Sequence, residues 1–490
     1  MTERLFPPEV QNWIDGQQRP AASAQWFDKV NPANGTSACR AARSRTEDVH
    51  EAVNAAKRAH PAWADTPPVQ RGMLLHKIVL GMQARQVELA RIVACETGKS
   101  YKDASAETGG AIALGLFYAS EGQRLYGRTT SSGIPDRFAM TIRQPIGVAG
   151  LIVPANTPIA NLAWKIFPAL VCGNAAVVKA AEDAPATAWM IGRIACEAGL
   201  PPGILNIIQG YGEEAGAPLV AHPDVGVISF TGSTAVGRSI QRVAGERLAK
   251  VSLELGGKNP FVVCDDADME NAVVWALRSA FSNAGQRCAS GSRIIIFDAV
   301  YEQFRDMLVN RTKQLKIGPG DDDDFGPVIT EKQLNRMIGT VDAARQKGAV
   351  ILTGGYRLTD PAHRDGFYMA PTIIENAGTR DDISTIELFG PITCLYRVAD
   401  FAEALAVAND SRYGLTACIH TRNLHRALQF TQKVQAGVAV VNAGTYGSEP
   451  HMPFGGFKQS GNGSREPGTE ALDVYSELKD VYINIDPHQL

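Results

Sequence analysis

The stretch from Ile146 to Glu246 alternates short apolar segments with longer amphipathic ones. Strands are expected from Ile146 to Val153 and at Ala175–Lys179, Leu205–Gln209 and Val225–Phe230, and helices over 158–172, 185–198 and 235–245. Such alternation predicts a parallel, doubly wound α/β sheet, because each pair of parallel neighbours needs a crossover helix. Dinucleotides bind at the carboxyl ends of the strands in sheets of this kind.

The chain is too long for one ordinary core, because its 490 residues exceed the size at which single cores stop growing. A second alternating region spans 260–442, with strands expected near positions 260, 293, 391, 415 and 437. The composition, 45% apolar and 20% charged, is that of a globular protein. We therefore expect two or three domains of the α/β class.

Charge and hydropathy exclude several kinds of partner. The net charge is −3 and no long run of Lys or Arg occurs, so no nucleic-acid partner is expected. The first ten residues contain no apolar core of signal-peptide length, and no apolar run reaches the roughly 18 residues of a membrane span. The sequence therefore predicts a cytoplasmic protein with no membrane partner.

Two separate segments have a strand-like composition outside the alternating regions. Residues from Tyr126 to Gln144 indicate a hairpin that projects from the body, and Val474–Ile485 mixes β-branched and aromatic residues. A projecting hairpin leaves a sheet edge open, and open edges are usually covered, often by another subunit. A homo-oligomer, dimer or tetramer, is expected.

One cysteine among the eight has the surroundings of a nucleophile. Cys288 lies in the stretch FSNAGQRCAS (Phe281–Ser290), where small residues leave its sulfur uncovered and glycine lets backbone N–H groups approach. The alternative is a buried cysteine that acts as a small hydrophobic residue. The cysteines show no C-x-x-C spacing and the nine histidines no ligand pairing, so free thiols and no metal site are expected.

Two polar residues elsewhere could assist such a nucleophile. Glu254 interrupts an apolar run in VSLELGGKNP, where burial would raise its pKa toward the range of a general base. Asn156 lies in IVPANTP, in a turn between a strand and a helix, with its amide free to donate to an oxyanion.

The motifs P-x-N-x-P, E-L-G-G-K and G-Q-x-C, in this chain order, resemble those of the aldehyde dehydrogenase superfamily, and the resemblance extends from Val10 to Ile485. It implies Cys288 as nucleophile, Glu254 as general base and Asn156 as oxyanion donor. It also implies the family's architecture, a Rossmann-type cofactor domain, an α/β catalytic domain and a small β oligomerisation arm. The expected limits are 1–122 and 144–253 for the NAD-binding domain, 254–441 for the catalytic domain, 442–473 for a return to the cofactor domain, and 123–143 with 474–490 for the arm.

A glycine pair is the first candidate for cofactor binding. Gly232 and Gly237 in ISFTGSTAVGR are spaced as G-x-x-x-x-G, which is compatible with a tight turn only or with a dinucleotide site. A helix that starts at Ser233 would offer free N–H groups to a pyrophosphate. The family's cofactor motif has this form, so the resemblance implies that these residues bind the cofactor, together with Leu255.

Further cofactor contacts are implied by the resemblance alone. Lys179 and Glu182 would otherwise be a solvated pair at the end of a strand, and in the family such residues hold the adenosine ribose. A carboxylate there repels a 2′-phosphate, which favours NAD, although Lys179 leaves NADP possible. Glu387 and Phe389 in ELFGP resemble the family's nicotinamide-side contacts.

Two positions depart from the common family pattern. Ala155 stands where a tryptophan usually contacts the pyrophosphate, and GNGSREPG (Gly461–Gly468) has one residue more than in many members, which leaves a proton-relay role of Glu466 open. A CoA-acylating dehydrogenase and a non-catalytic protein of the same fold are the alternative functions. Glu254 argues against the first, and retention of Cys288, Glu254 and Asn156 argues against the second.

The substrate class depends on Arg287, which immediately precedes Cys288. Its side chain is either solvated or ion-paired at the surface, or it is turned into the aldehyde tunnel. By resemblance, the helix after Asn156 lines that tunnel and contributes Asn161 and Trp164. A guanidinium beside polar groups suits a small-molecule aldehyde with a carboxylate at its far end, such as a semialdehyde of a dicarboxylic acid.

Overall fold

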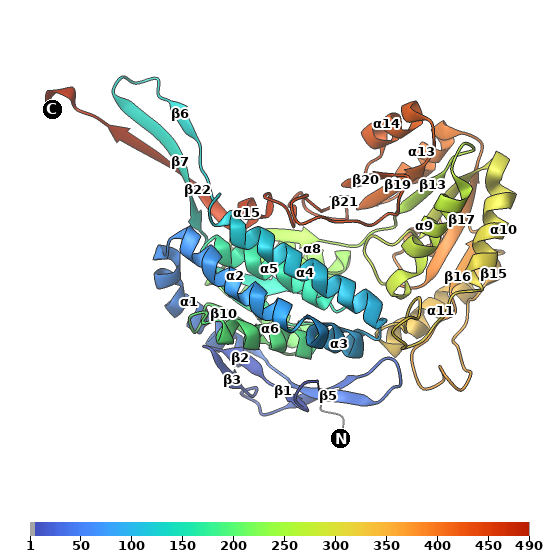
Figure 1. The fold of residues 1–490 in the computed structure, drawn as a ribbon, viewed down its shortest axis with the longest axis horizontal. Helices are drawn as coiled ribbons and strands as arrows, with labels where there is room; N and C mark the ends of the chain where they lie inside the picture. The colour runs from blue at the N-terminus through green and yellow to red at the C-terminus, as the bar shows by residue number, and fades with distance from the viewer. Residues whose placement is uncertain (1–4, 490) are drawn as a thin grey trace.

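The computed structural model describes residues 5–489, which form two sheets with separate hydrophobic cores and a projecting arm (Figure 1). The first core draws on residues between Val10 and Leu255 together with Ala471–Tyr475. The second core draws on residues between Phe261 and Val434. We refer to these as the first and second cores.

The first sheet has seven strands in the order β12-β11-β8-β9-β10-β2-β3. The strands are β2 (Asn12–Ile14), β3 (Gln17–Arg19), β8 (Val148–Ile152), β9 (Ala175–Lys179), β10 (Leu205–Ile208), β11 (Val225–Thr231) and β12 (Lys250–Glu254). The five strands from β8 to β12 pair in parallel, and β2 and β3 add an antiparallel edge. The predicted parallel, doubly wound sheet is confirmed, with strand limits within two residues of those expected.

The order of the strands places a crevice at one point of this sheet. From β8 the chain moves outward through β9 and β10, and then returns to β11 on the other side of β8. The connections after β8 and β11 therefore leave the sheet in opposite directions. A crevice opens at the carboxyl ends of such a strand pair, which is where ligands bind in open α/β sheets.

Two groups of helices surround the first sheet. The helices are α1 (Thr46–Asp65), α2 (Pro68–Ala84), α3 (Gln86–Thr97), α4 (Tyr101–Glu121), α5 (Pro158–Val171), α6 (Pro185–Glu197), α7 (Ala217–Ala221) and α8 (Thr234–Gly245). In one group α2, α3 and α4 pack on α5 and α6 (Figure 1). In the other group α1 and α8 both contact α7. α2 and α3 are separate helices because Arg85, between them, leaves helical geometry (φ −114°, ψ 23°).

The second sheet also has seven strands, in the order β15-β16-β17-β14-β13-β19-β20. They are β13 (Pro260–Val263), β14 (Arg293–Phe297), β15 (Val350–Thr353), β16 (Thr372–Glu375), β17 (Ile392–Val398), β19 (Thr416–His420) and β20 (Val438–Val441). All pairs are parallel except β15–β16. The five strands expected in this region are present, and β15 and β16 are added.

The helices of the second half are α9 (Met269–Phe281), α10 (Tyr301–Thr312), α11 (Glu331–Gln346), α12 (Asp382–Thr385), α13 (Phe401–Asn409), α14 (Leu424–Lys433) and α15 (Ala471–Val474). Three smaller groups of strands complete the chain: β1 (Glu9–Val10), β4 (Trp26–Val30) and β5 (Ser37–Ala42); β18 (Tyr413–Gly414) and β21 (Phe457–Lys458); β6 (Thr129–Ser131), β7 (Arg137–Pro145) and β22 (Ser476–Asn484).

The strands β6, β7 and β22 form the arm, which extends away from both cores (Figure 1). β22 pairs with β7 from Ser476 to Asn484, so the chain's last strand completes the hairpin. Phe138 and Ile483 are direct neighbours in this register and are 54% and 49% exposed. The domain limits expected from the sequence stay a prediction, and of these ranges residues 1–4 and 490 lie outside the described residues.

Candidate functional site

A cavity of about 650 Å³ lies where the two sheets face each other. The first sheet contributes the loops after β8 and β11 and the end of β12, and the second half contributes the Cys288 loop and residues of α11 and of the loop after α12. The sequence-predicted residues among its lining are Asn156, Asn161, Trp164, Gly232, Ser233, Glu254, Leu255, Cys288, Glu387 and Phe389. Four further predicted residues, Lys179, Glu182, Gly237 and Arg287, do not line it.

Cys288 follows a turn of unusual backbone geometry between α9 and β14. Asn283, Ala284 and Gly285 have consecutive positive φ angles of 54°, 53° and 67°. Such left-handed geometry is costly for residues other than glycine, so surrounding contacts must hold it. On the other side of the loop, the Asn259 amide donates to the carbonyls of Cys288 and Ser290, each at 2.8 Å. The nucleophile candidate is therefore fixed from both directions.

The surroundings of Cys288 disfavour the thiolate form of its side chain. Burial, and then the charges of Glu387 and Glu254, raise its pKa to about 12, against a smaller lowering by the backbone N–H of Ala289 and by Arg287. Only the thiolate is a nucleophile, so attack needs an additional positive charge close to the sulfur.

Asn156 follows β8 and is 7% exposed. One N–H of its side-chain amide donates to the carbonyl of Gln286 at 2.9 Å. A primary amide carries two N–H donors, so the second is free for another acceptor. Asn156 and Cys288 line the same cavity, which is the arrangement that an oxyanion donor requires.

Glu254 is the last residue of β12 and is only 3% exposed. Within the described residues, neither of its carboxylate oxygens has a hydrogen-bond partner. Burial, and then the charge of Glu466, raise the pKa of Glu254 well above its usual range, while Lys165 and Arg465 lower it. A carboxyl group that lines the cavity and whose pKa is raised can serve as a general base once it ionises.

Glu466 lies behind Glu254 and is fully buried. Its carboxylate accepts hydrogen bonds from Lys165 Nζ at 2.9 Å and from Ser229 Oγ at 2.9 Å. Lys165 belongs to α5 and is also fully buried, so the pair is a charged cluster inside the first core. Despite the additional residue in its loop, Glu466 is thus close enough to influence the charge of Glu254.

Four of the residues expected to bind a cofactor, Gly232, Ser233, Gly237 and Leu255, lie around the start of α8. Ser233 caps this helix by accepting from Val236 N, and the N-terminal residues Thr234 and Ala235 line the cavity. Such a helix start binds phosphate through free N–H groups and the helix dipole. Gly237 lies one turn further and faces Leu255 instead, where a Cβ atom would come within 2.6 Å of Leu255 Cδ2. Because Gly237 has no side chain, α8 can approach β12 closely.

The far end of the cavity contains Glu387 and Phe389. Glu387 Oε1 accepts from the N–H of Gly257 at 3.0 Å, and burial raises the pKa of Glu387 to about 7. A Cβ atom at Gly256 would lie 1.9 Å from Glu387 Oε2, so glycine is required for this carboxylate to reach the cavity. The donor and acceptor set from α8 to Glu387 therefore fits a dinucleotide, with phosphates at one end and hydroxyl groups at the other.

Lys179 and Glu182 lie at the carboxyl end of β9 and form an ion pair with each other. The Lys179 side chain is 3% exposed and that of Glu182 is 41% exposed. The pair is next to β8 in the same sheet and outside the cavity wall.

Arg287 has a different environment from the other predicted substrate residues. Asn161 and Trp164 of α5 line the cavity, whereas the guanidinium of Arg287 lies over the ring of Tyr446, 4.9 Å from its centroid. Its Nε is buried without a hydrogen-bond partner in the described part of the chain. Arg287 is thus neither a solvated surface residue nor part of the cavity wall.

Sequence reasoning missed four residues of the wall: Gln333 and Arg336 come from α11, and Arg412 and Tyr413 precede and begin β18. Phe454 and Gln459 come from PFGGFKQSG (Pro453–Gly461), a stretch that resembles the family's late glycine-rich loop over the site. No local motif distinguishes the first four. Asn259 follows the E-L-G-G-K motif directly, and this proximity was a usable signal.

Across residues 5–489 no group of side chains is suited to hold a metal ion, and all eight cysteines are free. None of the described helices is long and apolar enough to cross a membrane.

Comparisons with known proteins agree with this geometry. A family model described as the aldehyde dehydrogenase family matches residues 19–481. An α-ketoglutaric semialdehyde dehydrogenase of Bacillus subtilis is 39% identical over 96% of this chain and 97% of its own length. A hydroxyisobutyraldehyde dehydrogenase of Mycolicibacterium austroafricanum is 37% identical over 99% and 95%. A crystal structure of betaine aldehyde dehydrogenase from Staphylococcus aureus in complex with NAD⁺ has a TM-score of 0.95 and 33% identity, covering 98% of this chain and 95% of that one.

Proposed function

This chain belongs to the aldehyde dehydrogenase family, and we propose that its cavity oxidises a polar aldehyde to the carboxylic acid with NAD⁺ as the hydride acceptor. The observation that carries the proposal is the convergence of Cys288, Glu254 and Asn156 on one cavity, next to the start of α8. These three residues supply a nucleophile, a base and an oxyanion donor.

The first step is attack by the Cys288 thiolate on the aldehyde carbon. A carbon–sulfur bond forms and the carbonyl oxygen becomes an oxyanion, which accepts from the free N–H of the Asn156 amide and from the backbone N–H of Cys288. When bound along α8, NAD⁺ supplies a positive ring that favours the thiolate and an acceptor for the hydride that leaves the same carbon. The product of this half-reaction is a thioester on Cys288.

The second step is hydrolysis of that thioester. Glu254, once ionised, takes a proton from a water molecule, the hydroxyl adds to the thioester carbon, and the carbon–sulfur bond breaks. The carboxylic acid leaves and Cys288 returns to the thiolate. Glu254 suits this step because it lines the cavity with both oxygens unpartnered, so water can be its first hydrogen-bonding partner.

We propose NAD as the preferred cofactor. Glu182 is placed beside Lys179 at the end of β9, where its carboxylate would accept from ribose hydroxyls and repel a 2′-phosphate. Gly232, Ser233, Gly237 and Leu255 shape the start of α8, and Glu387 and Phe389 the opposite end of the cavity. NADP remains a weaker second cofactor because Lys179 can pair with a phosphate.

We propose a semialdehyde that carries a second carboxylate as the substrate class. Two relatives are named as dehydrogenases of α-ketoglutaric semialdehyde, from Bacillus subtilis and Haloferax volcanii. Asn161 and Trp164 make the cavity wall partly polar, which supports a polar aldehyde over one with an alkyl chain, whereas Arg287 does not line the cavity.

The exposed apolar side chains of the arm support a homodimer or homotetramer in which the arm pairs with a second copy. Eight free thiols suit a reducing cytoplasm. The domain limits given above are kept as part of this proposal.

The decisive experiment is NADH formation from an aldehyde panel by the purified protein and by its Cys288→Ala variant. The unmutated protein should produce NADH without CoA, and the variant should lose dehydrogenase and esterase turnover while it still binds NAD⁺. Dependence on CoA would favour the acylating alternative. Turnover by Cys288→Ala above a trace would contradict the nucleophile, and no NADH with any aldehyde would favour a non-catalytic role.

A further inference from the structure

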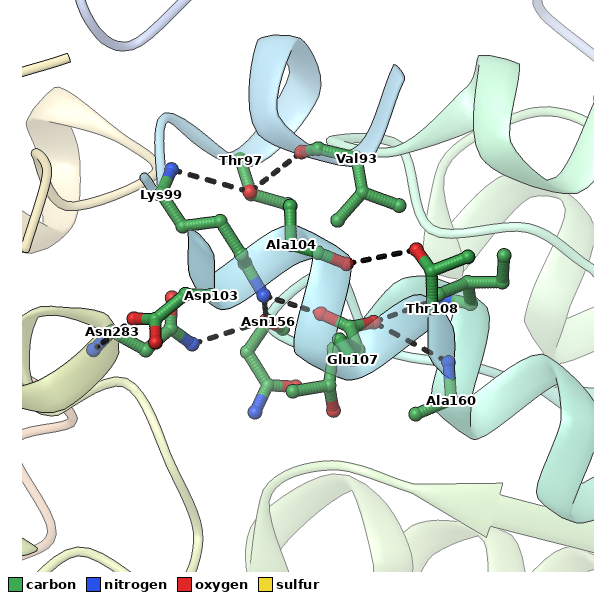
Figure 2. A network of polar contacts seen from close by, with 12 residues as sticks. Val93, Thr97, Lys99, Asp103, Ala104, Glu107, Thr108, Asn156, Ala160 and Asn283 are labelled. Carbon is green, nitrogen blue, oxygen red and sulfur yellow. Dashed lines mark hydrogen bonds and ion pairs between the residues drawn. The ribbon is translucent and has the colours of Figure 1, made fainter. Parts of the chain in front are cut away.

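A buried ion pair lies directly behind Asn156 (Figure 2). Lys99 Nζ donates to Glu107 Oε2 at 2.5 Å, and the two side chains are only 3% and 7% exposed. Lys99 sits in the short connection from α3 to α4, between Gly98, which ends α3 with φ 75°, and Ser100, which caps α4 by accepting from Asp103 N. Both neighbours fix the backbone from which the Lys99 side chain extends.

Each member of this pair has a second partner near Asn156. Glu107 Oε1 accepts from Ile159 N at 3.1 Å and Ala160 N at 3.3 Å, which are free amides at the start of α5. Lys99 Nζ donates to the backbone carbonyl of Asn156 at 2.7 Å. The ion pair thus contacts the turn between β8 and α5 at two places: Lys99 at the Asn156 carbonyl and Glu107 at the first backbone amides of α5.

The same carbonyl closes a ring of hydrogen bonds with the nucleophile loop. Asn283 Nδ2 donates to Asn156 O at 3.1 Å and to Gln286 O at 3.2 Å, and Gln286 O also accepts from Asn156 Nδ2 at 2.9 Å. Asp103, on the first turn of α4, accepts from the backbone N–H of Asn283 at 3.3 Å. The connection from α3 to α4 therefore contacts both the Asn156 turn and the loop that carries Cys288 (Figure 2).

We propose that Lys99, oriented by Glu107, is a positioning residue that holds the Asn156 amide in register with Cys288. The inference rests on the proposed roles of Asn156 and Cys288. Lys99 touches neither substrate nor cofactor in this arrangement, because its ammonium is enclosed by Glu107 and the Asn156 carbonyl. It fixes the position of the Asn156 carbonyl and, through the backbone, the direction in which the Asn156 side chain extends.

Loss of this contact should affect the transition state more than binding. Removal of one oxyanion donor costs about 10²- to 10³-fold in rate, and displacement of a reacting group by about 1 Å can cost about 10²-fold. Lys99→Met keeps the side-chain length and removes the donor, and Asn156 retains one restraint through Asn283. We therefore expect hydride transfer to slow by about 10- to 100-fold, with NAD⁺ affinity unchanged within about twofold.

The test measures NADH formation in a single turnover, with the enzyme in excess over glutaric semialdehyde or pentanal, whichever the unmutated enzyme oxidises faster. The variants are Lys99→Met, Asn156→Ala and the double substitution. If Lys99 acts through Asn156, the effect of Lys99→Met disappears in the Asn156→Ala background, so that the double variant equals Asn156→Ala within about twofold. A purely structural role would instead multiply the two losses.

Arg71→Met is the matched control. Arg71 is another buried cation that donates to backbone carbonyls, and its Nε bonds to Val171 O at 3.0 Å, at the opposite end of α5. This variant should lower the melting temperature and leave the single-turnover rate unchanged within about twofold. If Lys99→Met does not fold, Glu107→Gln replaces it, because it keeps an oxygen for the α5 amides while it removes the charge that orients Lys99. Its slower turnover, by about 3- to 10-fold, should also disappear in the Asn156→Ala background.

The outcomes separate this inference from the proposed function. An unchanged rate in Lys99→Met beside a slow Asn156→Ala overturns the positioning role alone. If Lys99→Met slows the single-turnover rate by the same factor in the unmutated protein and in Asn156→Ala, the positioning role is overturned as well. An unchanged rate in Asn156→Ala overturns the oxyanion assignment first, and the positioning role with it.

Discussion

Glu254→Gln should stall the enzyme and, at the same time, change how its stability depends on pH. In the folded protein, burial and the charge of Glu466 raise the pKa of Glu254, whereas in the unfolded chain this carboxyl titrates near 4.5. Above pH 4.5 the unfolded chain has released this proton and the folded chain still holds it. The contribution of Glu254 to stability therefore falls as pH rises, until the folded pKa is reached.

The size of the effect follows from linkage. A difference of one bound proton changes the free energy of unfolding by about 1.4 kcal/mol per pH unit. Between pH 4.5 and the raised folded-state pKa of Glu254, each pH unit should cost the unmutated protein this amount relative to Glu254→Gln, which has no proton to bind there. The buried glutamine amide adds its own cost, but that cost does not vary with pH. The slope of the difference against pH is thus the informative quantity.

Melting temperatures at several pH values measure that slope. Unfolding entropy of about 2 cal/mol/K per residue gives roughly 1 kcal/mol per degree for a chain of this length, so the difference in melting temperature should grow by about 1.4 °C per pH unit. It should grow by about 3 °C per unit if only the half that contains Glu254 melts in the transition. A difference that is constant from about pH 5 to pH 8 would show that Glu254 is already ionised in the folded protein, and would refute the reasoning.

The kinetic arm of the same experiment uses stopped-flow mixing with saturating NAD⁺ and aldehyde. Hydride transfer precedes the proposed role of Glu254, so a burst of about one NADH per active site should remain, followed by turnover slowed by about 10²- to 10⁴-fold. Loss of the burst itself would place Glu254 before hydride transfer.

Three further experiments test the cofactor preference, the substrate class and the role of the arm in oligomerisation. Glu182→Ala should narrow the preference for NAD⁺ over NADP⁺ in kcat/KM, because it removes the charge that repels a 2′-phosphate; equal use of both by the unmutated enzyme would contradict this. The unmutated enzyme should have a higher kcat/KM for glutaric semialdehyde than for pentanal, and Arg287→Met should keep this preference because Arg287 does not line the cavity; a preference for pentanal would exclude an acid substrate. Phe138→Asp combined with Ile483→Asp should shift the sedimenting species to the monomer, with Asp480→Ser on the other face of β22 as control; an unchanged mass would show that the arm does not hold the oligomer.

Most of the first sheet could be predicted from the sequence because its strands are buried on both faces. β8 and the first four residues of β9 are apolar, and a segment of helical length separates the two strands, so composition and length agree on one assignment. β15 and β16 could not be predicted in the same way. β15 is the edge strand of the second sheet and pairs antiparallel with β16, so this pair lies outside the strand–helix alternation on which the expectation rested.

The candidate site also contains residues that the sequence indicates and residues that only the fold brings together. Cys288, Glu254 and Asn156 stand in motifs whose residues are close in sequence, so local spacing revealed them. Arg336 and Tyr413 reach the cavity from distant elements, and only the packing of α11 and β18 brings them there. The guanidinium of Arg287 packs on the ring of Tyr446, which is distant in sequence, so this contact could not be predicted from the residues around Arg287. Lys99 follows the end of a helix, and no residue near it in the sequence indicates that its ammonium donates to the Asn156 carbonyl.

The left-handed turn at Asn283, Ala284 and Gly285 has a consequence for the order of events during refolding. The turn belongs to the second half of the chain, and the groups that Asn283 contacts, the Asp103 carboxylate and the Asn156 carbonyl, belong to the first half. Each core can collapse on its own contacts, but neither alone can hold three residues in this geometry against its intrinsic cost. Catalytic competence should therefore be regained later than helical circular dichroism, and a diluted, denatured sample should pass through a compact species with its secondary structure complete and its thiol loop still disordered.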